Sequence, residues 1–439
     1  MKMLEFARGT AFWTLDFLNG KKVKSALQIL KNCEDGIWSE EQIKTYQEAQ
    51  IQKLLSHAKA TVPFYKEQTD TNLNNWPVVN KNVLRLNGDG VLSSEYRKDE
   101  LIQMSTSGST GTPFACWQDA GKKKHVNAET LYYNGEIGFS IGRRIIYLRS
   151  VVTEVQKTPR QQFAQNIYLL DCNDLSDEGI REKLKFIVDY SKDCGAMLVG
   201  YASTLTAFQK YFDKFGYDEV KNARIYGIVS GSEMLYDATR SCIEKAFGCK
   251  CVSRYANEEN GFLGQDWDEN NVFLVNRADY FIEILKMDSN ESAEDREVGR
   301  IVVTDLYNYA MPMIRYDTGD VGARVKVIHN DRERYAIGNF GGRSVDLVKD
   351  CDGKLVSPHS ITNLMWEHKE VKQFQFIQKA KGKYRLNLNA DKDDIDEDKL
   401  IQDYKRIFGQ SSEFEVSYCD DVPVLASGKR RYIVNEEEN

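Results

Sequence analysis

The sequence predicts an α/β fold, in which a large N-terminal domain of several subdomains holds a largely parallel sheet and a small, mobile α+β domain follows it. Three observations lead to this prediction. Short apolar segments alternate with amphipathic segments between residues 143 and 255, as in strands joined by helices. Strand-like segments follow one another from residue 272 onward. A glycine-containing segment, NFGGRS at 339–344, then precedes a region with its own alternation. We therefore expect domains at 1–341 and 342–439.

The N-terminal region is expected to be mainly helical. The segment 40–65, EEQIKTYQEAQIQKLLSHAKATVPFY, has apolar residues three and four positions apart, which is typical of an amphipathic helix. The first segment, MKMLEFARGTAFWTLDFLNGKK, is apolar but contains Glu5, Arg8 and Asp16. These charges argue against a signal peptide or a membrane span, so we expect an amphipathic helix there.

The central region provides the expected parallel sheet. Its helices are expected at EGIREKLKFIVDYSK (178–192) and YDATRSCIEKAFG (236–248). Its strands are expected at RRIIYLRS (143–150), QNIYLLD (165–171), GAMLVGY (195–201), RIYGIVSGSE (224–233) and CKCVSRY (249–255), and consecutive strands begin with VFLVNRADYFIEIL (272–285).

Composition narrows the class of protein. The chain has 439 residues, of which 41% are hydrophobic and 28% charged, as in ordinary soluble globular proteins. Its 59 basic and 66 acidic residues give a formal charge of -7, so no broad basic surface is available for a nucleic acid. Nucleic acid is therefore not expected as a partner, and the oligomeric state stays open.

The nine cysteines are odd in number and scattered along the chain, which fits a reducing cytoplasm rather than a disulfide framework. Only Cys249 and Cys251 are close in sequence. Buried structural thiols are the expected interpretation. A contribution to a metal site is the alternative, although a structural metal usually needs four ligands and no histidine lies nearby in the sequence.

A segment of small and hydroxyl-bearing residues, MSTSGSTGTPF at 104–114, stands out. Backbone N–H groups and hydroxyls without bulk can hold phosphate, and a surface turn is the alternative. The segment matches neither the Walker A pattern nor the dinucleotide pattern G-x-G-x-x-G. The candidate phosphate-binding residues are Ser105, Thr106, Ser107, Gly108, Ser109, Thr110, Gly111 and Thr112.

This segment resembles the phosphate loop of the adenylate-forming superfamily, which includes acyl-CoA synthetases, peptide-synthetase adenylation domains and luciferases. Three further segments resemble motifs of that superfamily in the same order: SRYANEENG at 253–261, MIRYDTGDVG at 313–322 and LASGKRRYIV at 425–434. The chain is most similar to a branch that contains phenylacetate-CoA ligases, synthetases that transfer AMP to a deazaflavin, and CapK-like capsular polysaccharide proteins. The features shared with this branch are VPFY at 62–65, Phe114, and TDLYNYAMPMIRYDTGD at 304–320.

The resemblance implies a set of site residues. Lys429 would be the catalytic lysine, and Glu259 would help to bind Mg²⁺. The residues at adenine and ribose would be Gly231, Ser232, Tyr255, Ala256, Asp320 and Arg343. Two positions depart from the pattern, because Glu258 replaces a hydroxyl residue and Val345 stands where the hinge usually has Asp or Lys.

The resemblance also implies an activity: ATP- and Mg²⁺-dependent adenylation of a small-molecule carboxylic acid in the cytoplasm, release of pyrophosphate, and acyl transfer to an acceptor. CoA is the first choice of acceptor, and an amine or hydroxyl of a glycan precursor is the second. AMP transfer and a catalytically silent nucleotide-binding relative stay open. Tyr132, Tyr133 and Tyr201 are candidates for the acyl pocket, with core packing as the alternative for each.

Two expectations concern movement and surface contacts. The small domain would rotate about residues 343–346 and withdraw Lys429 after adenylation, as domain movements gate chemistry in many enzymes. The first helix would pack against the body of the protein. Association of its aromatic residues with a membrane surface is the alternative.

Overall fold

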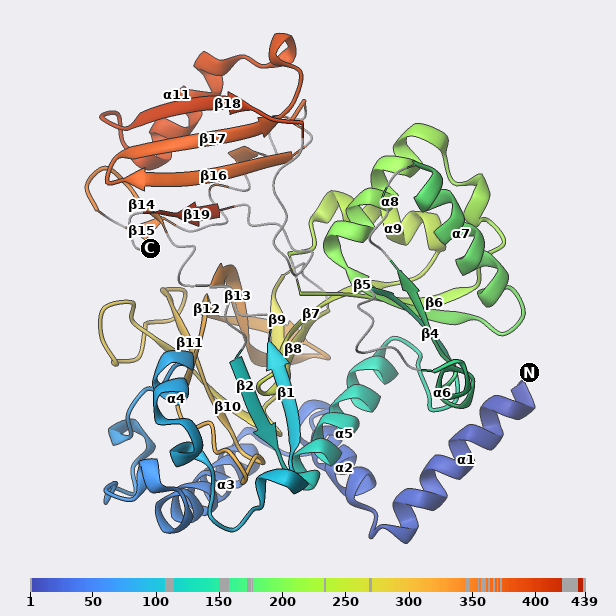
Figure 1. Cartoon of the computed structure of the whole chain (residues 1–439), viewed down its shortest axis with the longest axis vertical. Helices are drawn as coiled ribbons and strands as arrows, with labels where there is room; N and C mark the ends of the chain where they lie inside the picture. The colour runs from blue at the N-terminus through green and yellow to red at the C-terminus, as the bar shows by residue number, and fades with distance from the viewer. Residues whose placement is uncertain are drawn as a thin grey trace. The chain divides into compact units, whose positions relative to one another are not determined.

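We describe the protein in a computed structural model (Figure 1). The described residues are 2–106, 114–149, 158–171, 175, 177–232, 234–267, 271–343, 348–353, 355–356, 361, 364–365, 368, 370–371, 373–420 and 433–436.

The chain divides into two compact units. The first consists of Met1–Ile282, Val303–Arg315 and Lys326–Ala336, and the second consists of Glu283–Val302, Tyr316–Val325 and Ile337–Asn439. The last hundred or so residues thus lie in the second unit together with two earlier segments. The expected domain boundary at residues 341 and 342 stays a prediction.

The first unit begins with helices, as expected. They are α1 (Lys2–Leu18), α2 (Lys22–Glu34), α3 (Glu40–Thr61) and α4 (Lys81–Asn87). Short 3₁₀ turns surround α4 at Pro63–Tyr65, Leu73–Asn75, Gly88–Val91 and Lys98–Glu100. Helix α3 starts with a capping box, in which the Gln42 backbone N–H donates to Ser39 Oγ at 3.3 Å and the Ser39 N–H donates to Gln42 Oε1 at 2.9 Å.

A mainly parallel sheet follows. Its order is β9-β8-β7-β6-β5-β3-β4, where β3 to β7 pair in parallel and β8 and β9 add antiparallel strands. The strands are β3 (Arg144–Arg149), β4 (Ile167–Asp171), β5 (Ala196–Tyr201), β6 (Ile225–Gly231), β7 (Cys251–Asn257), β8 (Gly261–Asp266) and β9 (Phe273–Val275). The predicted α/β class is therefore confirmed.

Helices join these strands because parallel neighbours need a crossover connection. They are α6 (Pro159–Gln165), α7 (Asp177–Ser191), α8 (Ala202–Phe215) and α9 (Asp237–Phe247), with a 3₁₀ turn at Asp218–Val220, whereas α5 (Ala120–Glu136) precedes β3. Buried residues of α7, α8 and α9 form one hydrophobic core with β3, β5 and β6, including Leu184, Phe208 and Ile228. Figure 1 shows these three helices grouped beside the sheet.

Two further strands, β1 (Ile102–Thr106) and β2 (Phe114–Gln118), form an antiparallel pair. The strands β10 (Tyr280–Leu285), β11 (Val298–Asp305), β12 (Tyr316–His329) and β13 (Arg332–Arg343) are neighbours in that order. Each of these four contributes residues to both units.

The second unit contains a four-stranded sheet in the order β18-β17-β16-β19. Its elements are β14 (Val348–Lys349), β15 (Leu355–Val356), β16 (Gln373–Ala380), β17 (Lys383–Asn389), a 3₁₀ turn at Lys392–Asp394, α11 (Glu397–Phe408), β18 (Glu413–Tyr418) and β19 (Ile433–Asn435). Aromatic rings of the sheet and α11 pack together, with Phe376 and Phe408 stacked 5.0 Å apart. The expected α+β character of this region is confirmed.

Within the described part of the chain, no helix combines the length and apolarity that are needed to cross a membrane.

Candidate active site

The carboxyl ends of the parallel strands bring several predicted residues to one edge of the sheet. Tyr201 and Gly231 are register partners at the ends of β5 and β6, and Gly231 pairs in turn with Arg254 of β7. Ser232 follows with a φ of 69°, a conformation that side-chain-bearing residues seldom adopt. Ligands of open α/β sheets bind beyond the carboxyl ends of the strands, so this edge is a candidate nucleotide site.

Tyr255 lies one residue further along β7. Its ring is 5% exposed and its centroid is 6.0 Å from that of Phe273. Ala256, the next residue, is exposed. Tyr255 is therefore buried at the sheet edge, whereas its neighbour Ala256 is exposed.

The β7–β8 turn carries the predicted acidic residue. Asn257 closes the turn, because its Oδ1 accepts the backbone N–H of Asn260 at 2.8 Å. Glu258 is exposed, whereas Glu259 is only 2% exposed. Gly261 ends the turn with a φ of +129°, and a Cβ at this position would lie 2.6 Å from both Glu129 Oε2 and the Tyr280 hydroxyl. Only glycine fits this close approach.

A lysine outside the sequence motifs contacts this acid. Lys81 Nζ lies 2.5 Å from Glu259 Oε1. Lys81 is the first residue of α4, whose N-terminus is capped by Asn80 through bonds of 3.0 Å to the N–H groups of Asn82 and Val83. The helix start therefore holds a cation against the carboxylate.

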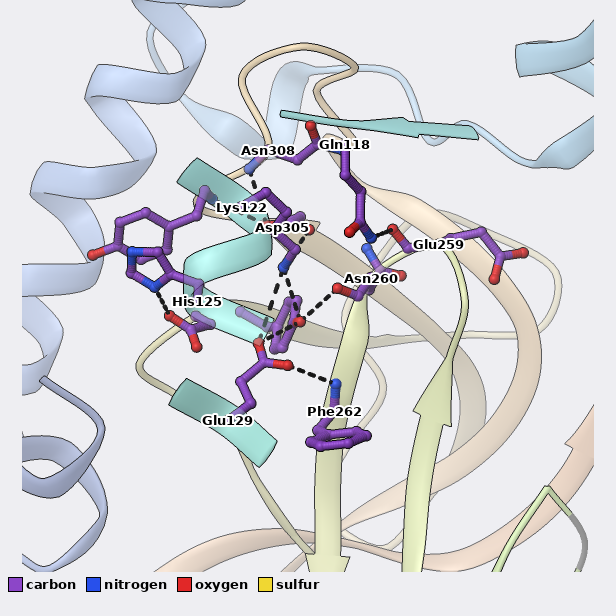
Figure 2. Close-up of polar contacts among 12 residues, drawn as sticks. Gln118, Lys122, His125, Glu129, Glu259, Asn260, Phe262, Asp305 and Asn308 are labelled. Atoms are coloured by element: carbon purple, nitrogen blue, oxygen red, sulfur yellow. Dashed lines mark hydrogen bonds and ion pairs between the residues drawn. The ribbon is translucent and has the colours of Figure 1, made fainter. Parts of the chain in front are cut away.

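Below the turn lies a network of fully buried charged and polar side chains (Figure 2). Lys122 of α5 is 2.8 Å from Asp305 Oδ2 and donates to the Tyr280 hydroxyl at 2.9 Å. The same hydroxyl is 2.7 Å from Glu129 Oε1 and 2.8 Å from the Asn260 carbonyl oxygen. Glu129 Oε2 accepts the N–H of Phe262 at 3.0 Å. The network therefore binds the backbone that follows Glu259, at Asn260 and Phe262.

The charges in this network shift one another. Burial raises the pKa of Glu129 well above its ordinary value and also raises the pKa of Asp305. Burial alone would lower the pKa of Lys122, but the charges of Asp305 and Glu129 raise it above its ordinary value. One buried cation thus faces two buried carboxyl groups, and removing Lys122 would leave both without a cation.

A second pair, of a half-buried histidine and a buried aspartate, lies beside this network. His125 Nδ1 lies 2.7 Å from Asp279 Oδ1, and the His125 ring stacks on Tyr307 at 3.5 Å. Burial would raise the pKa of Asp279, but the charges of His125 and Lys122 lower it. Asp279 precedes Tyr280, so this pair fixes the strand that supplies the central hydroxyl.

The end of strand β2 contacts the Glu259 turn. Gln118 Nε2 donates weakly to the carbonyl oxygens of Glu259 and Glu258, at 3.4 and 3.5 Å. The next residue, Asp119, caps α5 by accepting the N–H groups of Gly121 and Lys122 at 2.6 and 3.0 Å. Burial and then the charge of Glu259 raise the pKa of Cys116. Strand β2, the Glu259 turn and the start of α5 are thus joined.

The predicted phosphate loop joins β1 to β2. The two strands pair up to Thr106 and Phe114, and Ser105 and Thr106 belong to β1. Residues Ser107, Gly108, Ser109, Thr110, Gly111 and Thr112 lie outside the described residues. The described ends of the loop therefore belong to the β-hairpin that contacts the Glu259 turn.

The second unit carries Asp320 on β12. Gly319 has a φ of +77°, and its N–H donates to Asp317 Oδ1 at 3.0 Å. The Asp320 N–H donates to Thr318 Oγ1 at 3.1 Å, and the Thr318 hydroxyl donates to the Ile301 carbonyl at 3.0 Å. Asp320 is half-buried. Arg343 ends β13, and Val345 and Lys429 lie outside the described residues.

Two of the three tyrosines proposed for an acyl pocket lie in the core. Tyr132 and Tyr133 of α5 pack with Val23, Leu30 and Ile43. The Tyr132 hydroxyl donates to Asp35 Oδ1 at 2.6 Å. These contacts favour the core-packing alternative for both residues, whereas Tyr201 lies at the strand ends described above.

The cysteine pair also lies in hydrophobic surroundings. Cys251 is fully buried among core residues against which Cys249 packs. Burial raises the pKa of Cys249 to about 12. The described residues contain no group of three or more His, Cys, Asp and Glu side chains arranged to hold a metal ion. These facts favour structural thiols over a metal site.

The sequence is similar to those of several known proteins. Residues 348–436 match the family model of the CapK C-terminal domain. Protein CapK of Staphylococcus aureus is 24% identical over 384 residues, which cover 84% of this chain and 82% of CapK. Phenylacetate-coenzyme A ligase of Thermus thermophilus is 21% identical over 317 residues, which cover 64% of this chain and 65% of the ligase.

Solved structures agree with these matches. 2-Hydroxyisobutyryl-CoA ligase, in its postadenylation state with 2-HIB-AMP, superposes with a TM-score of 0.70 at 15% identity, covering 91% of this chain and 90% of the ligase. The chain therefore resembles CapK in sequence over most of its length and has the fold of these acid-CoA ligases. ATP-bound MatB of Rhodopseudomonas palustris matches this ligase fold over 77% of the chain and 68% of MatB, with a TM-score of 0.56 at 15% identity.

Proposed function

We propose that this protein adenylates a carboxylic acid with ATP and then transfers the acyl group to an acceptor. The acid's carboxylate attacks the α-phosphorus, pyrophosphate leaves, and an acyl adenylate remains. The observation that carries the proposal is the Lys81–Glu259 pair, because a cation from α4 contacts a nearly buried carboxylate of the motif turn in a chain with the ligase fold.

The donor set at Glu259 fits Mg²⁺ bound together with ATP. Mg²⁺ commonly uses one or two carboxylates and takes its other oxygens from phosphates and water, so a single acid is sufficient. Bound there, Mg²⁺ would neutralise charge on the phosphates. Lys81 contacts the same carboxylate and is positioned to bind a phosphate oxygen beside it.

The buried network has a positioning role in this proposal. Catalytic groups need supporting contacts that hold them in a productive geometry. Tyr280 and Glu129 bind the backbone just after Glu259, at Asn260 and Phe262, and Lys122 contacts both side chains. These residues act through the turn and do not touch the nucleotide.

Further roles rest on the motifs. The Ser105–Thr112 loop binds the β- and γ-phosphates, Gly231, Ser232, Tyr255 and Ala256 surround adenine, and Asp320 and Arg343 bind the ribose. Lys429 neutralises charge that develops in the transition state. Rotation of a C-terminal domain at 342–439 about residues 343–346 then withdraws Lys429 and admits the acceptor.

CoA is the proposed acceptor, supported by the CoA ligases among the relatives. The match to CapK over most of the chain supports a second candidate, an amine or hydroxyl of a glycan precursor. Two different functions compete with acyl transfer, namely AMP transfer to an acceptor and silent nucleotide binding. The exposed Glu258 in place of a hydroxyl residue is the observation that favours a silent relative.

The test is acid-dependent exchange of pyrophosphate into ATP by the purified chain with Mg²⁺, without any acceptor. The panel contains aryl acids, short aliphatic acids, hydroxy acids and amino acids. We expect one class of acid to support exchange, and thioester formation with CoA then tests the acceptor. If ATP binds but no acid supports exchange, acid adenylation is contradicted for that panel, and AMP transfer or the silent relative becomes the better account.

Two lysine variants separate the proposed roles. Lys429→Ala should lower the exchange rate by about 100-fold or more with little change in ATP affinity, because it removes a charge that acts in the transition state. Lys81→Ala should weaken ATP binding by about tenfold or more, as expected for loss of a charged hydrogen bond. The control is Lys192→Ala, which removes an exposed lysine paired with Asp189. Equal behaviour of Lys81→Ala and Lys192→Ala in calorimetry would remove Lys81 from the phosphate site.

A further inference from the structure

Helix α1 presents its apolar side chains to the outside. Met3, Phe6, Trp13 and Phe17 recur three to seven residues apart, which places them on one face of the helix. Phe6 is 76% exposed and Phe17 is 60% exposed. Leu4, Leu15 and Leu18 widen the exposed apolar surface. An ordinary surface helix shows the reverse pattern, with charged side chains outward.

The described charged side chains of α1 face the protein instead. Asp16 is buried and accepts the N–H groups of Val23 and Lys24 at 2.9 and 3.0 Å. Arg8 is half-buried and donates to the Phe163 carbonyl at 2.7 Å. Glu5 is half-buried as well. The outer surface of the helix therefore carries no charge among these residues.

The helix is held firmly in this orientation. Gly142 has a φ of +94°, and a Cβ there would lie 2.1 Å from the Glu5 carbonyl oxygen, so only glycine permits the contact. A groove of about 800 Å³ lies between α1 and the loop before β3. Its lining includes Glu5, Phe6, Trp13 and Phe17 on one side and Ile141 and Arg143 on the other. An exposed apolar surface with a groove of this size indicates a binding partner.

A cluster of lysines borders the apolar surface. Lys21, Lys22 and Lys24 follow the helix directly and are exposed, and Lys21 Nζ lies 5.0 Å from the centre of the Phe17 ring. Residues 1–31 contain six basic and two acidic residues, whereas the whole chain has 59 basic and 66 acidic residues. The apolar surface is thus attached to a strongly basic end of an acidic protein.

We propose that α1 lies on the surface of a membrane that contains anionic lipids. Met3, Phe6, Trp13 and Phe17 enter the boundary between headgroups and acyl chains, and the lysine cluster binds lipid phosphates. Interfacial helices combine an apolar face with flanking basic residues and aromatic rings in this way. The charges of Glu5, Arg8 and Asp16 keep α1 on the surface instead of across the bilayer.

A second copy of the chain is a less suitable partner. In a symmetric dimer the same surface meets itself, which would bring the lysine clusters of two copies to one interface. The acidic side chains of α1 face inward and could not pair with them. Anionic headgroups neutralise these lysines, and this charge complementarity favours the membrane.

The test is co-sedimentation of the full chain with vesicles of phosphatidylcholine alone and of phosphatidylcholine with phosphatidylglycerol at about 3:1. We expect binding to the anionic vesicles that weakens with salt. The double variant Trp13→Glu with Phe17→Glu should bind about tenfold or more weakly. The triple variant Lys21→Gln, Lys22→Gln and Lys24→Gln should bind the anionic vesicles about 100-fold more weakly, with little change on phosphatidylcholine alone.

The matched control is Ile328→Glu, which changes an exposed apolar residue of β12 and should bind as the unaltered chain does. Circular dichroism checks that each variant is folded, and the lysine variant keeps the test decisive if the glutamate variant unfolds. Equal sedimentation of the unaltered chain and the lysine variant would overturn the proposal. A dimer in light scattering that the glutamate variant dissociates, without any vesicle binding, would assign the surface to a second copy instead.

Discussion

The two motif carboxylates of this protein are held in different ways. Glu259 sits in a turn whose backbone is bound by Gln118, Glu129 and Tyr280, which come from distant parts of the chain. Lys122 contacts Glu129 and Tyr280 and pairs with Asp305. Asp320 sits in a half-buried strand segment that is shaped by Asp317, Thr318 and Gly319, and Arg300 and Ile301 of the neighbouring strand bind Asp317 and Thr318. The first acid lies beside a fully buried charge network, and the second lies in a half-buried strand segment.

This difference predicts which substitutions should lower the stability of the protein most. A buried charge that loses its partner keeps its full desolvation penalty, because water cannot replace the partner. A half-buried hydroxyl that is lost costs only about one net hydrogen bond. Substitutions in the Glu259 network should therefore affect folding first, and substitutions around Asp320 should affect mainly local geometry.

The largest effect is expected for Lys122→Met. Methionine has a similar length but no charge, so Glu129 and Asp305 would be left as buried carboxylates without a cation. The free energy of unfolding should fall by about 3–5 kcal/mol, measured by urea denaturation with circular dichroism. Lys123→Met is the control, because Lys123 is the next residue of α5 and is half-buried. Equal losses in the two variants would show that the network contributes little.

A smaller effect is expected for Glu129→Gln, and it depends on pH. Burial raises the pKa of Glu129 in the folded protein, so folding favours its protonated form. The contribution of Glu129 to stability is complete below its pKa in the unfolded chain, about 4.5. This contribution is lost as the pH rises through the pKa of Glu129 in the folded protein. Asp279 has a lowered pKa and so affects stability only at lower pH.

The glutamine side chain is neutral at every pH and nearly isosteric. It can still accept the Phe262 N–H, and its amide can donate to the Tyr280 hydroxyl. As the pH rises from about 5 to 8, the melting temperature of the Glu129→Gln variant should therefore fall less than that of the unaltered chain. Parallel curves for the two proteins would mean that Glu129 is ionised in the folded state throughout this range.

Sequence patterns predicted the parallel sheet well, because each strand and helix shows its apolar pattern within its own short segment. Segments such as GAMLVGY are short and continuously apolar, as strands buried on both faces must be. The helix EGIREKLKFIVDYSK places Ile180, Leu184 and Ile187 on one face, and all three are buried in the structure. Glu259 was expected in a site because its turn carries a motif.

The buried residues that support the Glu259 turn could not be predicted in the same way. Lys122 is the first of three consecutive lysines, and nothing in that run separates a buried lysine from its half-buried neighbours. Its spacing of seven residues from Glu129 was the only available signal, because such a spacing puts both on one helix face. Tyr132 and Tyr133 were candidates for the acyl pocket, but aromatic residues at core positions look the same in a sequence.

The smallest effect is expected for Thr318→Val, which tests the region around Asp320. The change removes the hydroxyl that donates to Ile301 and accepts the Asp320 N–H, and it should cost about 1 kcal/mol of unfolding free energy. If Asp320 binds the ribose, ATP affinity should also fall by a few-fold, measured by calorimetry, because its backbone loses a fixed acceptor. Thr318→Ser retains the hydroxyl and should restore both quantities. A loss as large as that of Lys122→Met would contradict the contrast between the two acids, since it would mean that the local hydroxyl carries as much stability as a buried charge network.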